Sequence, residues 1–427
     1  MNYCKYGLII LTSLILVACG GSNDNPNPRG NVIGVPTVKG VQSAAQLDAW
    51  TARTGLQSLT GTAKCDVTVV QINYQTPGTQ PSEMTNASAT ILIPSGAGCP
   101  GPFPLVAYGR ATNLEKAYTL ADPTNPETIL LMTFFAAQGY AVVATDYLGY
   151  AMSSYPYHPY LHADSEASSV IDSIRAARQA ASSLGLTLNG KVMVTGYSQG
   201  GHTSMATQRA IERENSGEFN LVAAAHLAGP YYISANLVAG VSSPVQNVQS
   251  LVTFQITAYQ NIYRNVYDKA SDVFKSPYDG YIETLFPSSL SSAVLNSMLP
   301  TGTPAEAQAA IFKSSFLTDL AKNTSNGTYV AGKKQDLLGW NPKAPTTLCG
   351  ASGDPTVKFS VNAQPTYDDF RSRGGANVTL VDVDPEIQAK YGSVLASNPT
   401  TYWNSYHGRY ESPFCCQVAK EFFDLYK

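Results

Sequence analysis

Residues 196–200 read Gly-Tyr-Ser-Gln-Gly and directly follow the apolar run Lys191–Thr195. The pattern Gly-x-Ser-x-Gly between a strand and a helix is typical of a sharp turn with the serine at its corner. Glycines on both sides of the serine let two backbone segments pass close together without a Cβ clash. We therefore expect Ser198 to project from the turn, with the N–H groups of the following helix beside it.

The composition fits a large globular chain and excludes one class of partner. The 427 residues suffice for one large α/β domain with an insertion or for two domains. Hydrophobic residues make up 44% and support a sizeable core, whereas charged residues make up only 13%. The net charge is −3 and no basic run is present, which argues against nucleic acid as a partner.

The N-terminal segment is predicted to serve export. The apolar run 7–18 follows Lys5 and is too short for a comfortable transmembrane helix, which is typical of a signal peptide. It ends in Leu-Val-Ala-Cys19, which resembles the lipobox of bacterial lipoproteins. This resemblance implies cleavage before Cys19, lipidation of its thiol and membrane anchoring. An ordinary signal peptide with a chance cysteine is the alternative.

We accordingly expect residues 1–18 to be the signal peptide and residues 19–40 to be the lipidated cysteine with a flexible, Pro-rich tether. Gly20 rather than Asp follows the cysteine, which in a Gram-negative bacterium would favour the outer membrane. The expected location is the cell envelope through a lipid anchor, with secretion as the alternative.

Disulfides are expected, because an exported protein can keep them. Beyond the N-terminal segment, five cysteines remain, namely Cys65, Cys99, Cys349, Cys415 and Cys416. Cys65 and Cys99 flank one predicted hairpin and are the preferred pair. Cys349 is expected to pair with Cys415 or Cys416, which leaves one cysteine over. No Cys-x-x-Cys motif or His/Cys cluster has metal-ligand spacing, so no metal is expected.

Strands and helices alternate along the first half of the chain. Apolar, β-rich runs predict strands at 66–74, 87–93, 103–108, 140–145, 191–195 and 220–226. Helical spacing of apolar residues predicts helices at 127–138, at 165–184 and from the serine turn to about residue 213. This alternation is typical of a mostly parallel sheet with helices on both faces.

The alternation stops at residues 232–340, which have helical character without a strand rhythm, and resumes afterwards. Strands are predicted at 346–350 and 377–382, and helices at 361–373 and near 415–426. The interpretation is a first core segment at 41–231, an inserted cap or lid at 232–340 and a second core segment at 341–427.

A serine nucleophile needs a base to take its proton and a carboxylate to orient that base. His407 is the preferred base, because it lies in a predicted loop between the last strand and the last helix. Such loops meet the serine turn at the carboxyl ends of parallel strands. The other four histidines have weaker claims. His202 is expected in packing and His226 in a strand, and His158 and His162 are expected on a solvated loop, with the mouth of a pocket as the alternative.

Asp354 is the preferred orienting acid, because it lies between Ser198 and His407 in the chain. It follows a predicted strand in the Gly-rich turn 350–357, a setting that projects a side chain across the end of the sheet. Asp382 or Asp384, after the next strand, is the alternative.

In their shared order, these blocks resemble bacterial secreted lipases and esterases of the α/β-hydrolase superfamily, particularly the secretory-lipase-like group. The resemblance covers about residues 60–427 and rests on Asp146–Tyr150, His158–Ala163, Gly196–His202, Gly350–Val357 and His407. It implies an α/β-hydrolase fold with an inserted helical cap. It also implies a serine carboxylic-ester hydrolase that works through an acyl-enzyme, without a metal or an organic cofactor.

The resemblance further implies residue roles. Ser198 would be the nucleophile, His407 the general base, Asp354 its acid and the backbone N–H of Gln199 one oxyanion donor. The second donor is where this sequence departs from the family, because Tyr108–Asn113 replaces the usual His-Gly and small residue. Aligning Arg110-Ala111 with His-Gly makes Thr112 the donor, and aligning on Gly109 makes it Arg110. We prefer Thr112.

The expected partner is an ester of a small molecule or a lipid, and no oligomeric state is indicated. A peptidase or an acyltransferase of the same fold would use the same chemistry, but no site for a charged terminus is recognisable. A non-catalytic, ligand-binding surface lipoprotein is the remaining alternative. Such a protein usually lacks a member of the triad, whereas this chain keeps all three.

We predict a preference for esters with short to medium acyl chains, because the predicted cap has no long apolar run. The measurement is the specificity constant on p-nitrophenyl acetate, butyrate, octanoate and palmitate. A higher specificity constant for palmitate than for the shorter esters would contradict the prediction.

Overall fold

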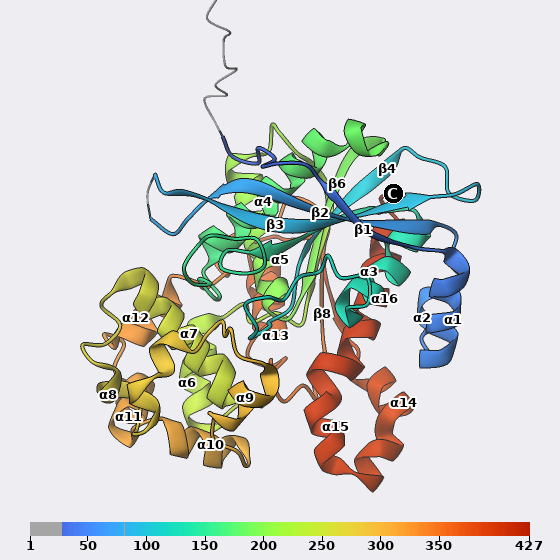
Figure 1. Cartoon of the computed structure of the whole chain (residues 1–427). Helices are drawn as coiled ribbons and strands as arrows, with labels where there is room; N and C mark the ends of the chain where they lie inside the picture. The colour runs from blue at the N-terminus through green and yellow to red at the C-terminus, as the bar shows by residue number, and fades with distance from the viewer. Residues whose placement is uncertain (1–27, 81) are drawn as a thin grey trace, which may run out of the picture.

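The computed structural model describes residues 28–80 and 82–427. The predicted signal peptide and Cys19 lie outside these residues. The described chain forms a nine-stranded sheet with helices on both faces (Figure 1). Within the described ranges, no helix is long and apolar enough to span a membrane.

The sheet is parallel over most of its width. Its strands are β1 (Thr37–Gln42), β2 (Asp66–Pro77), β3 (Met84–Ser95), β4 (Phe103–Gly109), β5 (Ala141–Tyr147), β6 (Leu188–Tyr197), β7 (Asn220–Leu227), β8 (Thr346–Gly350) and β9 (Val378–Asp382). Their order is β1-β2-β3-β5-β4-β6-β7-β8-β9. The pairs from β1 to β5 are antiparallel, and all pairs from β5 to β9 are parallel. The predicted mostly parallel sheet is confirmed.

Two layers of helices cover this sheet. The helices next to the sheet are α1 (Ala44–Thr54), α2 (Gln57–Thr60), α3 (Pro126–Phe134), α4 (Ala163–Ala180), α5 (Gln199–Glu214), α13 (Ala363–Ser372) and α16 (Ser412–Asp424). Two more, α14 (Asp384–Ser397) and α15 (Pro399–Ser405), project away from the sheet (Figure 1). Phe134 of α3 and Phe423 of α16 share an apolar cluster with Val142 of β5. The neighbouring Val143 belongs to the cluster on the other face, with Ile174 of α4. Side chains alternate along a strand, so each buried strand holds both layers.

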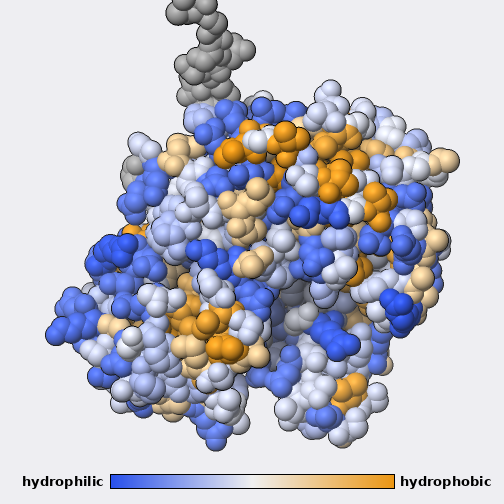
Figure 2. Space-filling view, in the orientation of Figure 1, coloured by the Kyte–Doolittle hydropathy of each residue, from blue (hydrophilic) through white to orange (hydrophobic). Residues whose placement is uncertain are grey.

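A separate group of helices lies between β7 and β8. It consists of α6 (Ile233–Ser242), α7 (Val248–Tyr263), α8 (Ala270–Val273), α9 (Ser292–Ser297), α10 (Pro304–Ile311), α11 (Ser314–Lys322) and α12 (Gly327–Lys333). Its apolar cluster includes Phe254, Phe312 and Leu320, together with Tyr160 and Leu161 from the loop before α4. In Figure 1 these helices lie beside α14 and α15, and Figure 2 shows a hollow between the two groups.

Part of the predicted tether 19–40 pairs with the core. Val32 forms a bridge to Tyr74 of β2, and Arg29 lies 3.1 Å from the Asp172 carboxylate. β1 then starts at Thr37, although none of its side chains is buried. This edge strand is held by backbone pairing with β2 rather than by buried side chains. Its sequence therefore lacks the alternation of apolar and polar residues from which strands are predicted.

The segment between β9 and the last helix is also different from the prediction. The sequence predicts a loop around His407, whereas the structure has α14, α15 and the π-helical turn η5 (Tyr406–Glu411). Pro385 and Pro399 lie in the first turns of α14 and α15. Proline fits there because the N–H groups of the first turn have no acceptor within the helix. His407 is therefore held by helical backbone.

Two disulfides brace the core, which confirms the expectation that the chain contains such bonds. One joins Cys65 to Cys99, and the other joins Cys349 to Cys415. Cys416 is buried and free. The second disulfide connects the end of β8 with α16, so it ties together the segments that carry Asp354 and His407.

Candidate active site

Ser198 lies at the corner between β6 and α5 with φ 60° and ψ −119°, a conformation that L-residues rarely adopt. The crowding around it explains the glycines. A Cβ on Gly196 would lie 2.2 Å from the carbonyl oxygen of Gly200. A Cβ on Gly200 would lie 1.8 Å from the carbonyl oxygen of Gly109 in β4. The turn thus forms only where three backbone segments can touch.

Ser198, His407 and Asp354 come together from three separate segments of the chain. The Nε2 atom of His407 lies 2.7 Å from Oγ of Ser198. The Nδ1 atom of His407 lies 2.7 Å from Oδ2 of Asp354. Because a carboxylate can only accept, Nδ1 donates to Asp354 and the Nε2 lone pair faces the serine hydroxyl. These distances suit proton transfer from the serine to the imidazole.

The surroundings of His407 favour its charged form. Burial lowers the pKa of His407, but the Asp354 carboxylate and then Glu411 outweigh burial and raise the pKa to about 10. Tyr197 donates a hydrogen bond from its hydroxyl to the backbone carbonyl of His407, and the two ring centroids lie 5.1 Å apart. Asp354 in turn accepts a hydrogen bond of 2.8 Å from the backbone N–H of Thr356.

The alternative acids are engaged elsewhere. Asp382 accepts hydrogen bonds from the backbone N–H groups of Ser352 and Asp384. Asp384 accepts from the hydroxyl of Tyr406 and the side-chain amide of Gln388. The geometry therefore favours Asp354 as the partner of His407.

A second carboxyl group beside His407, that of Glu411, was not found from the sequence. Oε2 of Glu411 lies 3.6 Å from Nδ1 of His407, and the residue is fully buried. Its spacing of four residues from His407 is the sequence feature that could have revealed it. Ligand atoms of Asp354, His407 and Glu411 lie within 4.8 Å of one another. Because both nitrogens of His407 are already engaged, we interpret the group as an acid–imidazole cluster rather than a metal site.

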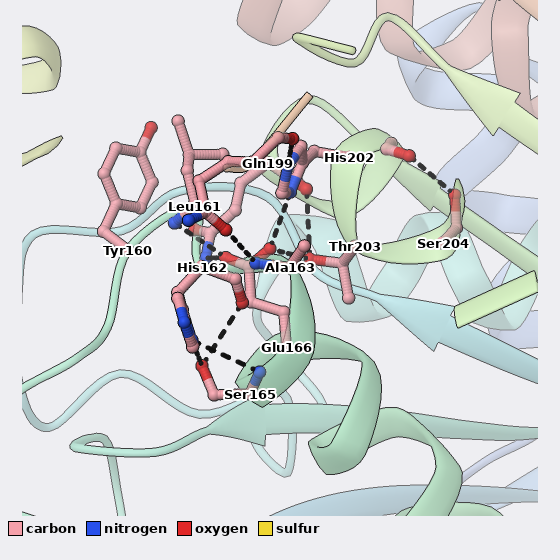
Figure 3. Close-up of polar contacts among 12 residues, drawn as sticks. Tyr160, Leu161, His162, Ala163, Ser165, Glu166, Gln199, His202, Thr203 and Ser204 are labelled. Carbon is pink, nitrogen blue, oxygen red and sulfur yellow. Dashed lines mark hydrogen bonds and ion pairs between the residues drawn. The ribbon is translucent and has the colours of Figure 1, made fainter. Parts of the chain in front are cut away.

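A buried carboxylate behind the serine turn fixes the start of α5. Glu166 of α4 accepts hydrogen bonds from the backbone N–H of Leu161 at 3.0 Å and from Nε2 of Gln199 at 2.7 Å. It also accepts from Nδ1 of His202 and Oγ1 of Thr203, both at 2.9 Å (Figure 3). Glu166 was not predicted from the sequence, although it lies one helical turn before the apolar positions of α4. Four donors around one carboxylate leave little freedom to the residue that follows Ser198.

The histidines expected on a solvated loop are buried instead. Nδ1 of His158 donates to the carbonyl of Leu148 at 3.0 Å, and its Nε2 lies 2.7 Å from the side-chain amide of Gln199. Burial, followed by the Arg110 charge, lowers the pKa of His158 well below its ordinary value. His162 is buried at the N-cap of α4. The aromatic residues of this segment pack against the helices between β7 and β8, which removes the segment from solvent.

Of the two candidates for the second oxyanion donor, Thr112 lies at the site and the Arg110 side chain does not. Thr112 lines the same cleft as Ser198, and its hydroxyl lies 2.9 Å from the hydroxyl of Tyr160. The guanidinium of Arg110 is fully buried, with its carbon 4.0 Å from the ring centroid of Tyr150. Arg110 thus anchors the loop after β4, and Thr112 remains next to the serine.

Ser198 lies where two hollows meet. One is an open cleft bordered by the loop after β4 and by α15, with Thr112, Trp403 and His407 on its walls. The other is an apolar cavity inside the helices between β7 and β8. Its lining includes Leu237, Val252, Phe312, Phe316 and Leu320. Ser198 and Leu251 border both hollows, so the apolar cavity meets the open cleft at the serine.

Comparison with known proteins identifies the family of the chain. The sequence model of the secretory lipase family matches residues 116–400. The chain belongs to the secretory lipase family. Among solved structures, it is similar to LipA of Xanthomonas oryzae, described as a rice cell wall degrading esterase, with 34% identity and a TM-score of 0.82. That match covers 94% of this chain and 100% of LipA.

Two further matches define the limits of the likeness. A ligand-bound form of LipA matches with 34% identity and a TM-score of 0.81, covering 93% of this chain and 100% of that one. Lipase A of Candida antarctica, in its closed state, shares 16% identity over 84% of this chain and 78% of that one, with a TM-score of 0.57. This second likeness shows the fold alone. Among curated proteins, no sequence matches the chain.

This secretory lipase is therefore a carboxylic-ester hydrolase with the α/β-hydrolase fold, as the sequence predicts. An ester substrate follows from the family. The same membership sets aside the alternative of a non-catalytic binding protein and supports export of the chain.

We predict that Gly200→Ala lowers kcat/KM for a p-nitrophenyl ester more than tenfold and lowers the melting temperature. The added methyl would collide with the carbonyl oxygen of Gly109 and force α5 away from β4. The matched control is Gly217→Ala, because a Cβ at Gly217 meets nothing within 4 Å. Equal activity of the two variants would contradict the steric argument.

Proposed function

We propose that this secretory lipase hydrolyses esters through a triad of Ser198, His407 and Asp354. Oγ of Ser198 attacks the ester carbonyl while Nε2 of His407 takes its proton. The imidazolium then gives that proton to the departing alcohol, which leaves an acyl group on Ser198. A water molecule attacks this acyl-enzyme by the same route and releases the acid. The observation that carries the proposal is the pair of 2.7 Å contacts made by His407.

We propose the backbone N–H groups of Gln199 and Thr112 as the oxyanion donors. Gln199 is the first residue of α5, where N–H groups lack partners within the helix. The Glu166 network holds its side chain, and Thr112 faces the same cleft as Ser198. A single donor of this kind contributes about 2.7–4 kcal/mol to transition-state stabilisation.

The two hollows suggest how the ester lies. We propose that the acyl chain enters the apolar cavity, since transfer of each CH₂ from water contributes about 0.8 kcal/mol. The alcohol part would occupy the open cleft near Trp403, from which it can leave after the first step. In this arrangement residues 232–340 act as the cap that shapes acyl selectivity, inserted between the core segments 41–231 and 341–427.

We also propose that the exported chain is anchored to a membrane through lipidated Cys19. The support is the lipobox-like sequence at the end of the apolar run 7–18. In a Gram-negative bacterium the expected location is the outer membrane. The described residues begin at residue 28, close to Cys19 in the chain, so the catalytic core would lie near the anchored end.

The test of the proposed function is Ser198→Ala assayed on p-nitrophenyl butyrate. Because no other group replaces the nucleophile, we expect kcat to fall by at least about 10⁴-fold. Ser182→Ala is the control, since Ser182 is exposed and lies in the short turn before β6, whereas Ser198 follows the other end of that strand. Circular dichroism would verify that both variants are folded. Equal rates for the wild type and Ser198→Ala would overturn the proposal.

The pH profile provides an independent prediction. His407 must be neutral to accept a proton, and Asp354 and Glu411, working against burial, raise its pKa to about 10. Below that pH the imidazole is mostly protonated, so kcat/KM should rise with pH throughout the neutral and alkaline range. The measurement is initial rate at low substrate, corrected for spontaneous hydrolysis. A profile that is flat between about pH 6 and pH 9 would contradict the assignment of the base.

A further inference from the structure

Glu411 has an unusual position for a buried carboxyl group. It follows His407 by four residues in the π-helical turn η5, and Oε2 lies 3.6 Å from Nδ1 of His407. Asp354 already holds that nitrogen at 2.7 Å. Within the described chain, neither oxygen of Glu411 has a hydrogen-bond partner. A full buried charge without partners is strongly unfavourable, so its presence here requires an explanation.

Two carboxyl groups that share one imidazole in a dry site do not both ionise readily. Asp354 is the better anion, because it accepts from Nδ1 of His407 and from the backbone N–H of Thr356. Glu411 has neither bond. Burial, followed by the charge of Asp354, raises the pKa of Glu411 well above its usual range. Of the two carboxyl groups, Glu411 is therefore the one that holds a proton more tightly.

The other groups around Glu411 do not offset its charge. Tyr197 of β6 and Tyr231, which follows β7, face it from the sheet, and Tyr406 belongs to its own turn. Together with Asp354, these groups are neutral or acidic, so His407 alone among the facing groups can carry a positive charge.

We propose that Glu411 is a positioning residue for His407, a role that rests on the proposed triad. While Asp354 is charged, Glu411 is an uncharged carboxyl beside it. When the Asp354 charge is removed, Glu411 ionises and binds Nδ1 of His407 in place of Asp354. In that event Glu411 releases its proton to solvent, and its carboxylate accepts the hydrogen bond from Nδ1–H. Oε2 must approach by about 0.8 Å to reach the distance of a charge-assisted hydrogen bond. Its place on the same turn as His407 allows so small a shift.

The experiment compares Asp354→Ala, Glu411→Gln and the double variant, with Ser198→Ala as the inactive reference. Where nothing replaces the acid of such a triad, its loss lowers kcat by about 10⁴-fold. We expect Asp354→Ala to lose only about a hundredfold, because Glu411 substitutes for it. The double variant should lose about a hundredfold more. Equal activity of Asp354→Ala and the double variant would overturn the inference.

The pH profiles in the Asp354→Ala background give a readout that a merely structural role would not move. In that background Glu411 is ionised and its charge raises the pKa of His407, so adding Glu411→Gln to Asp354→Ala should shift the acidic limb of kcat/KM to lower pH by about one unit. An unshifted limb in a folded variant would contradict the inference. Melting temperatures verify folding, and if Asp354→Ala unfolds, Asp354→Asn with and without Glu411→Gln makes the same comparison.

The two proposals fail in different ways. If Ser198→Ala keeps wild-type activity, the triad itself is wrong and the role of Glu411 falls with it. If Ser198→Ala is inactive while Asp354→Ala and its double variant agree, the triad stands and only the role of Glu411 is wrong.

Discussion

The close approach of three backbone segments at the serine turn is the constraint on which the site depends. β4, β6 and the start of α5 meet where Gly109, Gly196 and Gly200 have no Cβ. This contact holds Ser198 at a positive φ, a strained conformation that persists only when the surroundings over-determine it. The backbone N–H of Ser198 also donates to the carbonyl of Leu227 in β7 at 2.9 Å. The parallel sheet is thus the support that keeps the hydroxyl in place.

Two buried glutamates near this turn differ in their hydrogen bonding, and this difference indicates which one stabilises the fold. Glu166 receives four hydrogen bonds, each worth about 1.5–3 kcal/mol when the acceptor is charged, and so stabilises the fold around Gln199. Glu411 receives none within the described chain, although it is equally buried. The fold gains nothing from such a group in its charged form. Its position beside His407 is consistent with a role in the acid–imidazole cluster.

Much of the architecture was predictable because burial leaves periodic patterns. The central strands are buried along their whole length and mostly apolar, and the alternation of strands with helices indicated a parallel sheet. β1 escaped prediction because its side chains are exposed, and the helices after β9 escaped because Pro385 and Pro399 suggest interruptions when read locally. The burial of His158 depends on the distant cap helices, whose packing cannot be read from the loop itself.

The sequence by itself determined the serine turn, the chain order of Ser198, Asp354 and His407, and the family, because each depends on short segments with fixed spacing. Only the tertiary structure decided that Asp354 rather than Asp384 faces His407, and that Glu411 shares the same nitrogen. These choices depend on where the loop after β8 meets η5, since Asp354 and His407 are 53 residues apart in the chain. Side-chain distances of a few ångströms are set by that packing, and no local pattern encodes them.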